Sequence, residues 1–401
     1  MIEEKKVQLI GIDGGASKVS GWEIKMDSQS GLFSLGELNV QKQYRDYEEF
    51  QAGFTPVDVK QQLAEMNGEI QLTEDEKKHG RAYMYAAADV IIEITKKLRA
   101  ENILVGIGMP GLKAPDKRGI VALANGPRLP EYAAIIEKRL EAAGVKLSAP
   151  ISHLGSDADY CGLGEEYAAD GAFGTSDNAY YLGGGTGVAD AMKLRGKLLP
   201  FDAAKPWIAK AWEMKSSAGL SIERYASSGG IQFLYSQASG ISLDELNTEG
   251  IFPPQIMEKA IAGDEAAKKV FADVATYLGR LLFERMQTLW SGWKGNFEFV
   301  NPAKPALESA HPYHQTFLEK LIIGQRLGDL MAESIGKDIL WEPVMETINA
   351  EFAKVSDAKF KNAYLCCDSF RQSQIFISKL REAPALGAGV DAWLTHKKKE
   401  A

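Results

Sequence analysis

Two glycine-rich turns contain the residue types that bind phosphate groups. The first reads Asp13-Gly14-Gly15-Ala16-Ser17-Lys18, and the second spans Gly183 to Gly187. Glycine lets backbone N–H groups converge on a phosphate, and Asp13 is placed to hold Mg²⁺ directly or through water. The alternative is that both turns only connect the strands of a hairpin. Hairpin connections are usually shorter and contain fewer glycines than the second turn, which favours phosphate binding there.

A pair of carboxylates could supply a catalytic base. Ser156-Asp157-Ala158-Asp159 follows a short apolar run and opens a helical pattern. A carboxylate at the end of a strand can accept the proton of a hydroxyl that attacks phosphorus. The alternative is helix capping, a role that Ser and Asp fill well. Because a helix turns about 100° per residue, only one of the two acids can easily point at an acceptor hydroxyl.

A third motif formally matches the dinucleotide-binding pattern, since Gly106 to Gly111 fits G-x-G-x-x-G. That pattern requires a helix immediately after it. Leu112 to Asp116 has no helical periodicity and contains Pro115. We therefore expect a tight turn beside a ligand site. The second glycine turn is not a P-loop, because it lacks the Gly-Lys-Ser/Thr ending and precedes a strand.

Strands and helices alternate along the chain. Apolar runs predict strands at residues 7–12, 20–24, 103–107, 151–154, 178–182 and 188–194. Helical spacing predicts helices at residues 74–99, 132–143, 156–166, 265–289 and 383–394. Residues 25–60 are polar without strong periodicity, and we expect an elaborated loop there. The alternation predicts α/β layers. A hairpin around a glycine turn recurs at residues 7–24 and 178–199, which suggests two similar halves with a ligand cleft between them.

Length and composition indicate a two-domain protein without a nucleic-acid or membrane surface. A chain of 401 residues can build two cores, and its net charge of −8 does not favour anionic partners. It contains no run of about 18 apolar residues, and its first residues lack the features of a signal peptide. The three cysteines, Cys161, Cys366 and Cys367, have no metal-ligand spacing. This usage fits a reducing compartment, and we expect a cytoplasmic protein.

The order of these motifs resembles the sugar kinases of the ROK (repressor, open reading frame, kinase) family, within the actin/hexokinase/Hsp70-like superfamily. The resemblance covers most of the chain. Ile10 to Gly15 is similar to the family's first phosphate motif, and Gly185 to Gly187 is similar to its second. Ser156 to Glu165 resembles its catalytic segment, and Ile222 to Ser227 resembles its Leu-Glu-x-Tyr-Ala-Ser element.

This resemblance implies an α/β fold of two actin-like (ribonuclease H-like) domains with an interdomain cleft. The first domain would comprise residues 1–124, completed by a C-terminal helix at about 385–401, and the second residues 125–384. The implied reaction is phosphorylation of a hexose or hexose derivative by ATP with Mg²⁺. Closure of the two domains would exclude water from the reaction.

The resemblance also assigns roles to individual residues. Asp157 would be the catalytic base, and Asp13 would position the metal ion. The expected sugar contacts are Gly111, Asn125, Ser156, Glu213 and Glu223. The expected ATP contacts are Gly14, Gly15, Ser17, Lys18, Gly184, Gly185, Thr186, Gly187, Gly324 and Gln325.

Several positions depart from the family's pattern. Ser216 stands where a sugar-site histidine is usual, and the zinc-binding cysteine cluster is absent, so we expect no zinc. Ser156 replaces an asparagine that contacts the sugar, and Gln325 replaces a glycine near adenine. These departures leave the identity of the sugar open.

Two other functions remain open from the sequence. One is an ATPase resembling the BadF type, whose first motif also reads Asp-Gly-Gly. The other is a non-catalytic nucleotide or sugar sensor. The first phosphate motif begins about ten residues into the chain, which leaves no room for the helix-turn-helix of the family's repressors. We therefore expect a sugar and ATP as partners, without nucleic acid or membrane, and a homodimer is left open.

Overall fold

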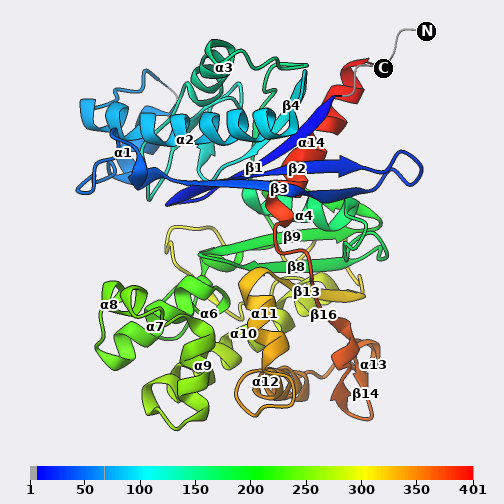
Figure 1. The fold of residues 1–401 in the computed structure, drawn as a ribbon. Coiled ribbons are helices and arrows are strands. Elements are labelled where there is room, and N and C mark those ends of the chain that lie inside the picture. Colours follow the sequence, from blue (N-terminus) through cyan, green and yellow to red (C-terminus); the bar gives the residue numbers. More distant parts are fainter. Residues whose placement is uncertain (1–6, 67, 401) are drawn as a thin grey trace. The chain divides into compact units, whose positions relative to one another are not determined.

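The computed structural model describes residues 7–66 and 68–400, and the chain divides into two compact units (Figure 1). The first unit comprises residues 1–169 with 382–401, and the second comprises residues 170–381. Each unit contains a five-stranded sheet with parallel and antiparallel neighbours, so the predicted α/β class is confirmed. The observed boundary differs from the predicted one after residue 124. Residues 125–169 remain in the first unit because they supply a strand to its sheet and a helix to its core.

The first unit has seven strands, five α-helices and one short 3-10 helix among its described residues. The strands are β1 (Gln8–Gly14), β2 (Lys18–Met26), β3 (Phe33–Gln43), β4 (Ile103–Gly108), β5 (Leu112–Lys113), β6 (Ile120–Ala122) and β7 (Leu154–Gly155). The helices are η1 (Tyr44–Asp46), α1 (Val59–Glu65), α2 (Glu74–Leu98), α3 (Tyr132–Ala142), α4 (Asp157–Tyr167) and α14 (Ala383–Glu400).

The first sheet brings three strand ends together at one edge. Its order is β3-β2-β1-β4-β7, with β1 antiparallel to β2 and parallel to β4, and with β4 parallel to β7. Asp13 pairs with Gly108, and Gly108 pairs with Gly155. The segments that follow these three residues therefore share the carboxyl edge of the sheet, where α/β proteins usually bind ligands.

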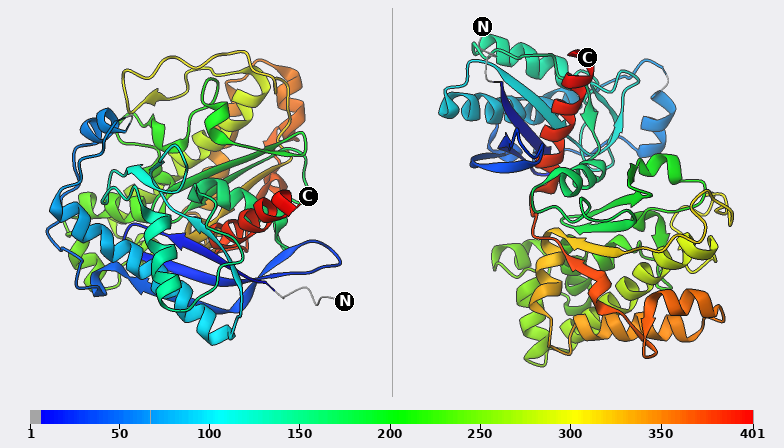
Figure 2. Two further views of the ribbon diagram at one scale, coloured as in Figure 1. Left: turned by 90° about the horizontal axis from the view of Figure 1, so that it is seen from above. Right: turned by 90° about the vertical axis from the view of Figure 1, so that its right-hand side faces the viewer.

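Helices α2 and α14 pack against opposite faces of this sheet. Ile10 and Ile12 of β1 belong to the core cluster that α2 helps to form. Gly11 faces the other way, where a Cβ atom would stand 1.9 Å from the carbonyl oxygen of Ala385 in α14. Glycine is needed here because the backbone of α14 lies directly on the strand (Figure 2). The Gly/Ala-rich composition of the C-terminal helix thus reflects this close contact.

The prediction of a loop at residues 25–60 is wrong for residues 33–43. They form β3, an edge strand that pairs antiparallel with β2. Only Phe33, Gly36 and Val40 of β3 are buried, and the register shifts at Trp22 and Ile24 of β2. That irregular spacing of buried residues hides the two-residue period by which a strand is recognised.

The second unit has nine strands, nine α-helices and two 3-10 helices among the residues that are described. The strands are β8 (Ala179–Gly184), β9 (Val188–Leu194), β10 (Lys197–Leu199), β11 (Met214–Lys215), β12 (Glu298–Phe299), β13 (Lys320–Gly324), β14 (Leu365–Cys366), β15 (Ser369–Phe370) and β16 (Ile375–Ile377). The helices are α5 (Phe201–Ala204), η2 (Ala211–Glu213), α6 (Glu223–Ala226), α7 (Ser228–Ser239), α8 (Leu243–Thr248), α9 (Pro253–Ile261), α10 (Glu265–Ser291), α11 (Gln325–Glu333), α12 (Trp341–Ala353), α13 (Ala358–Tyr364) and η3 (Gln372–Gln374).

The second sheet has the order β10-β9-β8-β13-β16, with helices gathered against it (Figure 1). The long helix α10 packs against α7, α9 and α12 and joins one large core with the sheet. A buried ion pair ties α10 to β9, because Arg285 contacts Asp190 at 3.1 Å. The hydroxyl of Tyr180 also donates to Asp190, at 2.6 Å. These contacts fix the β8–β9 hairpin and therefore the glycine turn at its tip.

The described helices include none with the length and apolar character that a membrane span requires. Residues 1–6, on which the expectation of no signal peptide rests, lie outside the described part of the chain.

Candidate active site

Tyrosine side chains hold the first glycine turn by its carbonyl groups. The hydroxyl of Tyr44 donates to the carbonyl of Gly15 at 3.1 Å, and that of Tyr83 donates to the carbonyl of Ala16 at 2.9 Å. The N–H of Tyr44 donates to the carbonyl of Ser17 at 3.0 Å. Within residues 7–66 and 68–400, no hydrogen bond is found for the N–H groups of Ala16 and Ser17. The turn is rigid, and it offers two donors to an anion.

Acidic side chains converge beside this turn. Asp13 is half-buried at the end of β1, and its pKa is raised from 3.8 to about 7. Burial is the largest cause, the carboxylates of Asp157 and Glu382 add to it, and Lys18 opposes it. The ammonium of Lys18 also donates to the side chain of Gln41 on β3 at 2.6 Å. The edge of the sheet therefore carries more negative than positive charge, which suits a cation.

The two candidate bases differ in their surroundings. Asp157 is the first residue of α4, is half-buried and accepts a hydrogen bond from the N–H of Ala158 at 3.0 Å. Asp159 is exposed. Ser156 occupies the N-cap position, but its side chain makes no capping hydrogen bond. Asp157 itself accepts a hydrogen bond at the helix N-terminus, and its carboxylate raises the pKa of Asp13.

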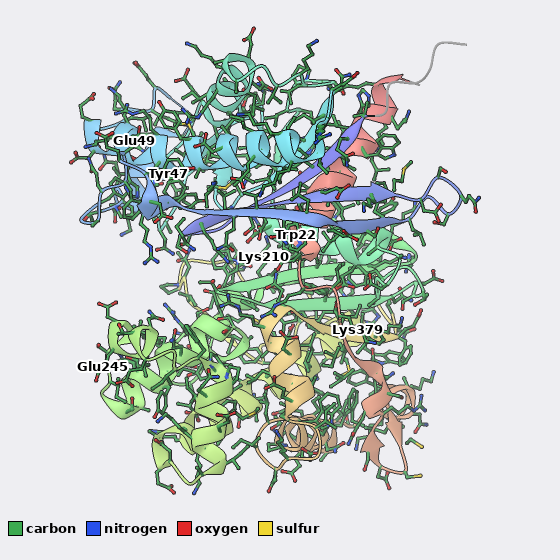
Figure 3. The ribbon with its side chains drawn as sticks, viewed as in Figure 1. Trp22, Tyr47, Glu49, Lys210, Glu245 and Lys379 are labelled. Atoms are coloured by element: carbon green, nitrogen blue, oxygen red, sulfur yellow. The ribbon has the colours of Figure 1, made fainter. Side chains whose placement is uncertain are left out.

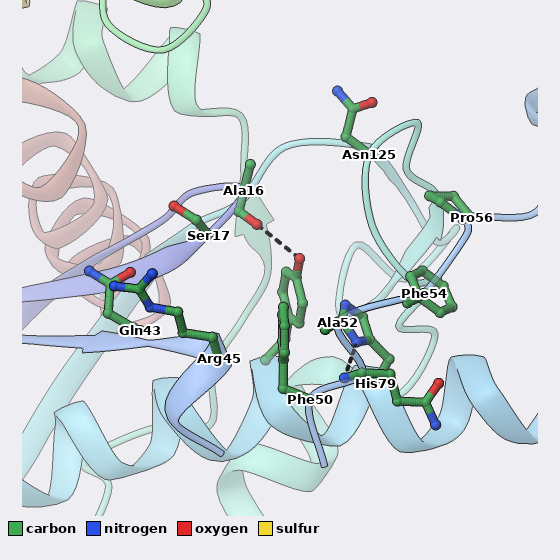
Figure 4. Close-up of a pocket in the computed structure, with 12 residues that line it drawn as sticks. Ala16, Ser17, Gln43, Arg45, Phe50, Ala52, Phe54, Pro56, His79 and Asn125 are labelled. Atoms are coloured by element: carbon green, nitrogen blue, oxygen red, sulfur yellow. Dashed lines mark hydrogen bonds between the residues drawn. The ribbon is translucent and has the colours of Figure 1, made fainter. Parts of the chain in front are cut away.

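Two further predicted sugar contacts flank the same edge. Gly111 has φ of 93°, and a Cβ atom there would stand 2.6 Å from the carbonyl oxygen of Ala122. Only glycine fits this turn after β4. Asn125 is exposed after β6 and lines a cavity together with Ser17 (Figure 4). The first unit therefore brings together Asp13, Asp157 and the first turn, with Asn125 close to that turn.

The second glycine turn also leaves backbone donors unused. It connects β8 and β9, and the N–H of Gly185 donates to the carbonyl of Gly187 at 2.9 Å. The N–H of Gly229, in the first turn of α7, donates to the carbonyl of Gly185 at 3.3 Å. Among the described residues no partner is found for the N–H groups of Thr186 and Gly187. Both glycine turns thus present two consecutive N–H groups.

The glycines of the second turn are required by close packing. A Cβ atom on Gly184 would stand 2.4 Å from Leu327, and one on Gly185 would stand 2.7 Å from the side-chain oxygen of Gln325. Neither glycine has a positive φ. Gly324 pairs with Gly183 because β13 runs parallel to β8. The structure therefore brings the predicted ATP contacts of the second unit to one edge of its sheet.

The two predicted sugar-binding glutamates make structural contacts. Glu223 accepts a hydrogen bond from the N–H of Val188 at 3.0 Å and so supports the end of the second turn. Glu213 contacts the ammonium of Lys304 at 2.5 Å through one oxygen and accepts from the N–H of Lys210 at 2.8 Å through the other. Both oxygens of Glu213 are thus engaged, and its proposed contact with a sugar would compete with these bonds.

Sequence reasoning missed three residues that contact or act on the predicted site residues. Glu382 acts on Asp13 across more than 360 residues of chain, and no local pattern reveals it. Lys304 lies in an irregular segment without periodicity. Gly229 was detectable in principle, since Ser227 caps α7 and a helix that begins Ser-Gly-Gly allows another backbone to approach. A Cβ atom on Gly229 would stand 2.5 Å from the carbonyl oxygen of Thr186.

The residues present suit magnesium. Mg²⁺ is usually held by one or two carboxylates together with phosphate oxygens and water. The half-buried carboxyl of Asp13, with Asp157 and Glu382 nearby, provides such a setting. No group of three or more His, Cys, Asp or Glu residues that could enclose a metal by itself is found in the described ranges. The expectation of no zinc stays a prediction.

No family model and no curated protein matches the chain. Solved structures do match it over nearly its whole length. A ROK family glucokinase from Streptomyces griseus, in complex with glucose and AMPPNP, has a TM-score of 0.55 at 15% identity and covers 96% of this chain and 99% of its own. The ROK hexokinase from Thermus thermophilus has a TM-score of 0.53 at 17% identity, covering 98% and 100%. The chain has the fold of the ROK family sugar kinases.

This ROK fold is shared with a regulator. A ROK family transcriptional regulator, a homolog of the E. coli MLC protein, has a TM-score of 0.54 at 13% identity and covers 98% of this chain and 81% of its own. The ROK fold by itself therefore does not separate catalysis from regulation of transcription, and a reaction can be inferred only from the residues of the site.

Proposed function

We propose that this protein is a sugar kinase that transfers the γ-phosphoryl group of ATP to a hydroxyl of a hexose or hexose derivative. One observation carries the proposal: Asp13 and Asp157 interact electrostatically beside a turn that offers two unpaired N–H groups. A cation site, a base and a phosphate cradle are the parts that phosphoryl transfer needs. The ROK fold that the chain shares with a glucokinase and a hexokinase supports the proposal.

The first unit contributes the base and the cation site. Asp157 accepts the proton of the acceptor hydroxyl while that oxygen forms a bond to the γ-phosphorus. The bond between this phosphorus and the bridging oxygen breaks, and ADP leaves with the electron pair. Asp13 would hold Mg²⁺, which neutralises charge on the phosphates when bound. Asn125 and the backbone at Gly111 orient the acceptor, and the N–H groups of the first turn bind phosphate oxygens.

The second unit has a candidate nucleotide-binding turn of its own. The N–H groups of Thr186 and Gly187 are the proposed donors to phosphate oxygens, and the side chain of Gln325 at the start of α11 lies against this turn. Glu223 holds the turn in shape through Val188. This role differs from the direct sugar contact that the sequence predicts for Glu223. The carboxylate of Glu223 can bind the acceptor through this oxygen only if it gives up the hydrogen bond from Val188.

A non-catalytic sensor is the second candidate. It is favoured by the engagement of Glu213, whose two oxygens bind Lys304 and Lys210. A site that has lost one sugar contact can still bind ligand without turning it over. The retained pair Asp13 and Asp157 favours the kinase, because a sensor has no need of a base beside a cation site.

Release of ADP by purified protein separates these functions. The reaction contains ATP, Mg²⁺ and one member of a panel of hexoses, amino sugars and polyols. Release that requires a sugar supports the kinase. Release without sugar identifies an ATPase of the BadF type, and nucleotide binding without any release identifies a sensor.

A further inference from the structure

A cavity of about 380 Å³ lies inside the first unit, beside the first glycine turn (Figure 4). Its volume is within the range of small-molecule sites, which is roughly 300 to 1,000 Å³. It is lined by Ala16, Ser17, Gln43, Arg45, Phe50, Gln51, Ala52, Phe54, Pro56, His79, Tyr83 and Asn125. Ser17 and Asn125 also belong to the proposed active site. The cavity therefore adjoins the place where the acceptor is proposed to bind.

The segment after β3 forms one wall of this cavity and is fixed to α2. The hydroxyl of Tyr47 (Figure 3) donates to Asp89 on α2 at 3.1 Å. The N–H of Gln51 donates to Nδ1 of His79, also on α2, at 3.1 Å. These bonds tie the segment to α2 at Tyr47 and at Gln51, so this wall of the cavity is anchored at two points.

His79 lines the cavity and carries a hydrogen-bond donor on its ring. A backbone N–H can only donate, so Nδ1 of His79 accepts the bond from Gln51, and the neutral ring carries its proton on Nε2. Burial lowers the pKa of His79, which keeps the ring neutral. Its side chain is 4% exposed, and no bond to Nε2 is found in the described part of the chain. In Figure 4 the ring of His79 lies beside the ring of Phe54.

The lining of the cavity includes both aromatic rings and polar side chains. The ring of Phe54 stacks on His79 at 4.3 Å between centroids, and that of Phe50 lies 4.7 Å from it. Arg45, at the rim, is exposed and has no ion pair among the described residues. Aromatic rings next to polar side chains suit a sugar ring, whose C–H groups pack on aromatic carbon while its hydroxyls take hydrogen bonds.

We propose that this cavity binds a second sugar ring, so that the acceptor is a glycoside such as a disaccharide rather than a free monosaccharide. This inference rests on the proposed function and names its substrate class. The ring that carries the reacting hydroxyl lies near Asp157, and the second ring contacts His79, Phe54 and Arg45. An N-acyl substituent would occupy only a small part of the volume and would leave Arg45 without a role.

Steady-state kinetics with matched sugars tests the proposal. Glucose, N-acetylglucosamine, cellobiose and maltose serve as acceptors with ATP and Mg²⁺. The wild type should show a kcat/KM for at least one disaccharide that exceeds the value for glucose by about tenfold or more, which corresponds to about 1.4 kcal/mol.

Two variants place this preference in the cavity. Ala52 is exposed and lines the cavity, so Ala52→Trp fills it without disturbing the core. This variant should lose the disaccharide preference and keep the kcat/KM for glucose. Thr55→Trp is the control, because Thr55 is exposed in the same segment but does not line the cavity. Arg45→Met, at another exposed position, should raise KM for the disaccharide alone.

The outcomes separate this inference from the proposed function. A wild type that phosphorylates glucose or N-acetylglucosamine more efficiently than both disaccharides refutes the second-ring site and leaves the kinase standing. The same holds if folded Ala52→Trp and Arg45→Met both retain the full disaccharide preference. If no sugar is phosphorylated, the proposed function fails and the glycoside site fails with it.

Discussion

The ionised carboxylate of Asp13 lowers the stability of the folded state, at a residue that is proposed to hold a cation. Its pKa of about 7 lies above the ordinary 3.8 because burial and the neighbouring acids Asp157 and Glu382 disfavour its charge. A cation bound at the carboxylate would offset this cost. Without a ligand, the folded protein binds the proton of Asp13 more tightly than the unfolded chain does.

The stability of the Asp13→Asn variant should therefore depend on pH relative to the wild type. Between pH 3.8 and about 7 the folded state holds more protons than the unfolded chain, so the free energy of unfolding of the wild type falls as pH rises through this window. The asparagine side chain of the variant has no proton to lose. The variant should have the higher Tm at about pH 8 and a similar Tm at about pH 4. An equal difference in Tm at both values would show that Asp13 does not carry the shifted pKa.

At the scale of elements, glycines set how closely strands, turns and helices approach. The sequence predicts that the second turn needs glycine for close approach of its backbone to phosphate. The structure shows no positive φ at Gly184 or Gly185, and it shows neighbours within 3 Å of a built Cβ atom. At Gly185 the neighbour is the end of a flexible side chain, whereas at Gly184 the neighbours include backbone. Substitutions at these two positions therefore test ligand binding and folding separately.

Gly185→Val should weaken ATP binding while the protein stays folded. Its nearest neighbour is the end of the flexible Gln325 side chain, which can move aside. The added side chain then stands beside the N–H groups of Thr186 and Gly187. Isothermal titration with ATP should show at least a tenfold weaker Kd, about 1.4 kcal/mol, with little change in Tm. If the folded variant binds ATP as tightly as the wild type, the turn only connects the two strands of the hairpin.

Gly184→Val is the contrasting variant. Its Cβ atom would meet both Leu327 and the carbonyl oxygen of Ala226 within 2.5 Å, and neither can move cheaply. This variant should lose stability, which separates packing from ligand binding in the same turn.

Gly11→Ala should destabilise the docking of α14. Its new Cβ atom would stand 1.9 Å from the backbone of Ala385, and overpacking of this kind costs about 1 to 3 kcal/mol or more. Gly53→Ala is the matched control, because no atom lies within 4 Å of its Cβ position. Urea unfolding measures both free energies. A loss no larger for Gly11→Ala than for Gly53→Ala contradicts the close contact between α14 and β1.

For the whole molecule, local patterns predicted much of the fold and part of the site. The predicted hairpin at β1 and β2 is confirmed, and so is the predicted helix at α2, which begins with a capping box of Thr73 and Glu76. These features form between residues that are close together in the sequence, so a local pattern can reveal them. The domain boundary and Glu382 could not be predicted, since both depend on where distant segments pack. β3 escaped prediction because few of its residues are buried.

The protein should contain no stoichiometric zinc. The family's cysteine cluster is absent from the sequence, and two of the three cysteines, Cys366 and Cys367, are exposed neighbours in sequence in the hairpin of β14 and β15. Two adjacent thiols alone do not form the usual four-ligand zinc site. Elemental analysis of dialysed protein measures this directly, and one zinc atom per chain would overturn the prediction.

The central claim is that Asp157 accepts the proton of a sugar hydroxyl during phosphoryl transfer from ATP. The most direct test is sugar-dependent ADP release by the wild type, Asp157→Asn and Asp159→Asn, with ATP affinity measured in parallel. Asparagine fills the volume of aspartate but cannot take the proton, and positioned bases contribute on the order of 10² to 10⁴ in rate. Asp157→Asn should lose at least about a hundredfold in kcat and still bind ATP. Asp159 is exposed, and its variant should keep most activity. Full activity of Asp157→Asn, or inactivity of Asp159→Asn alone, would contradict the account.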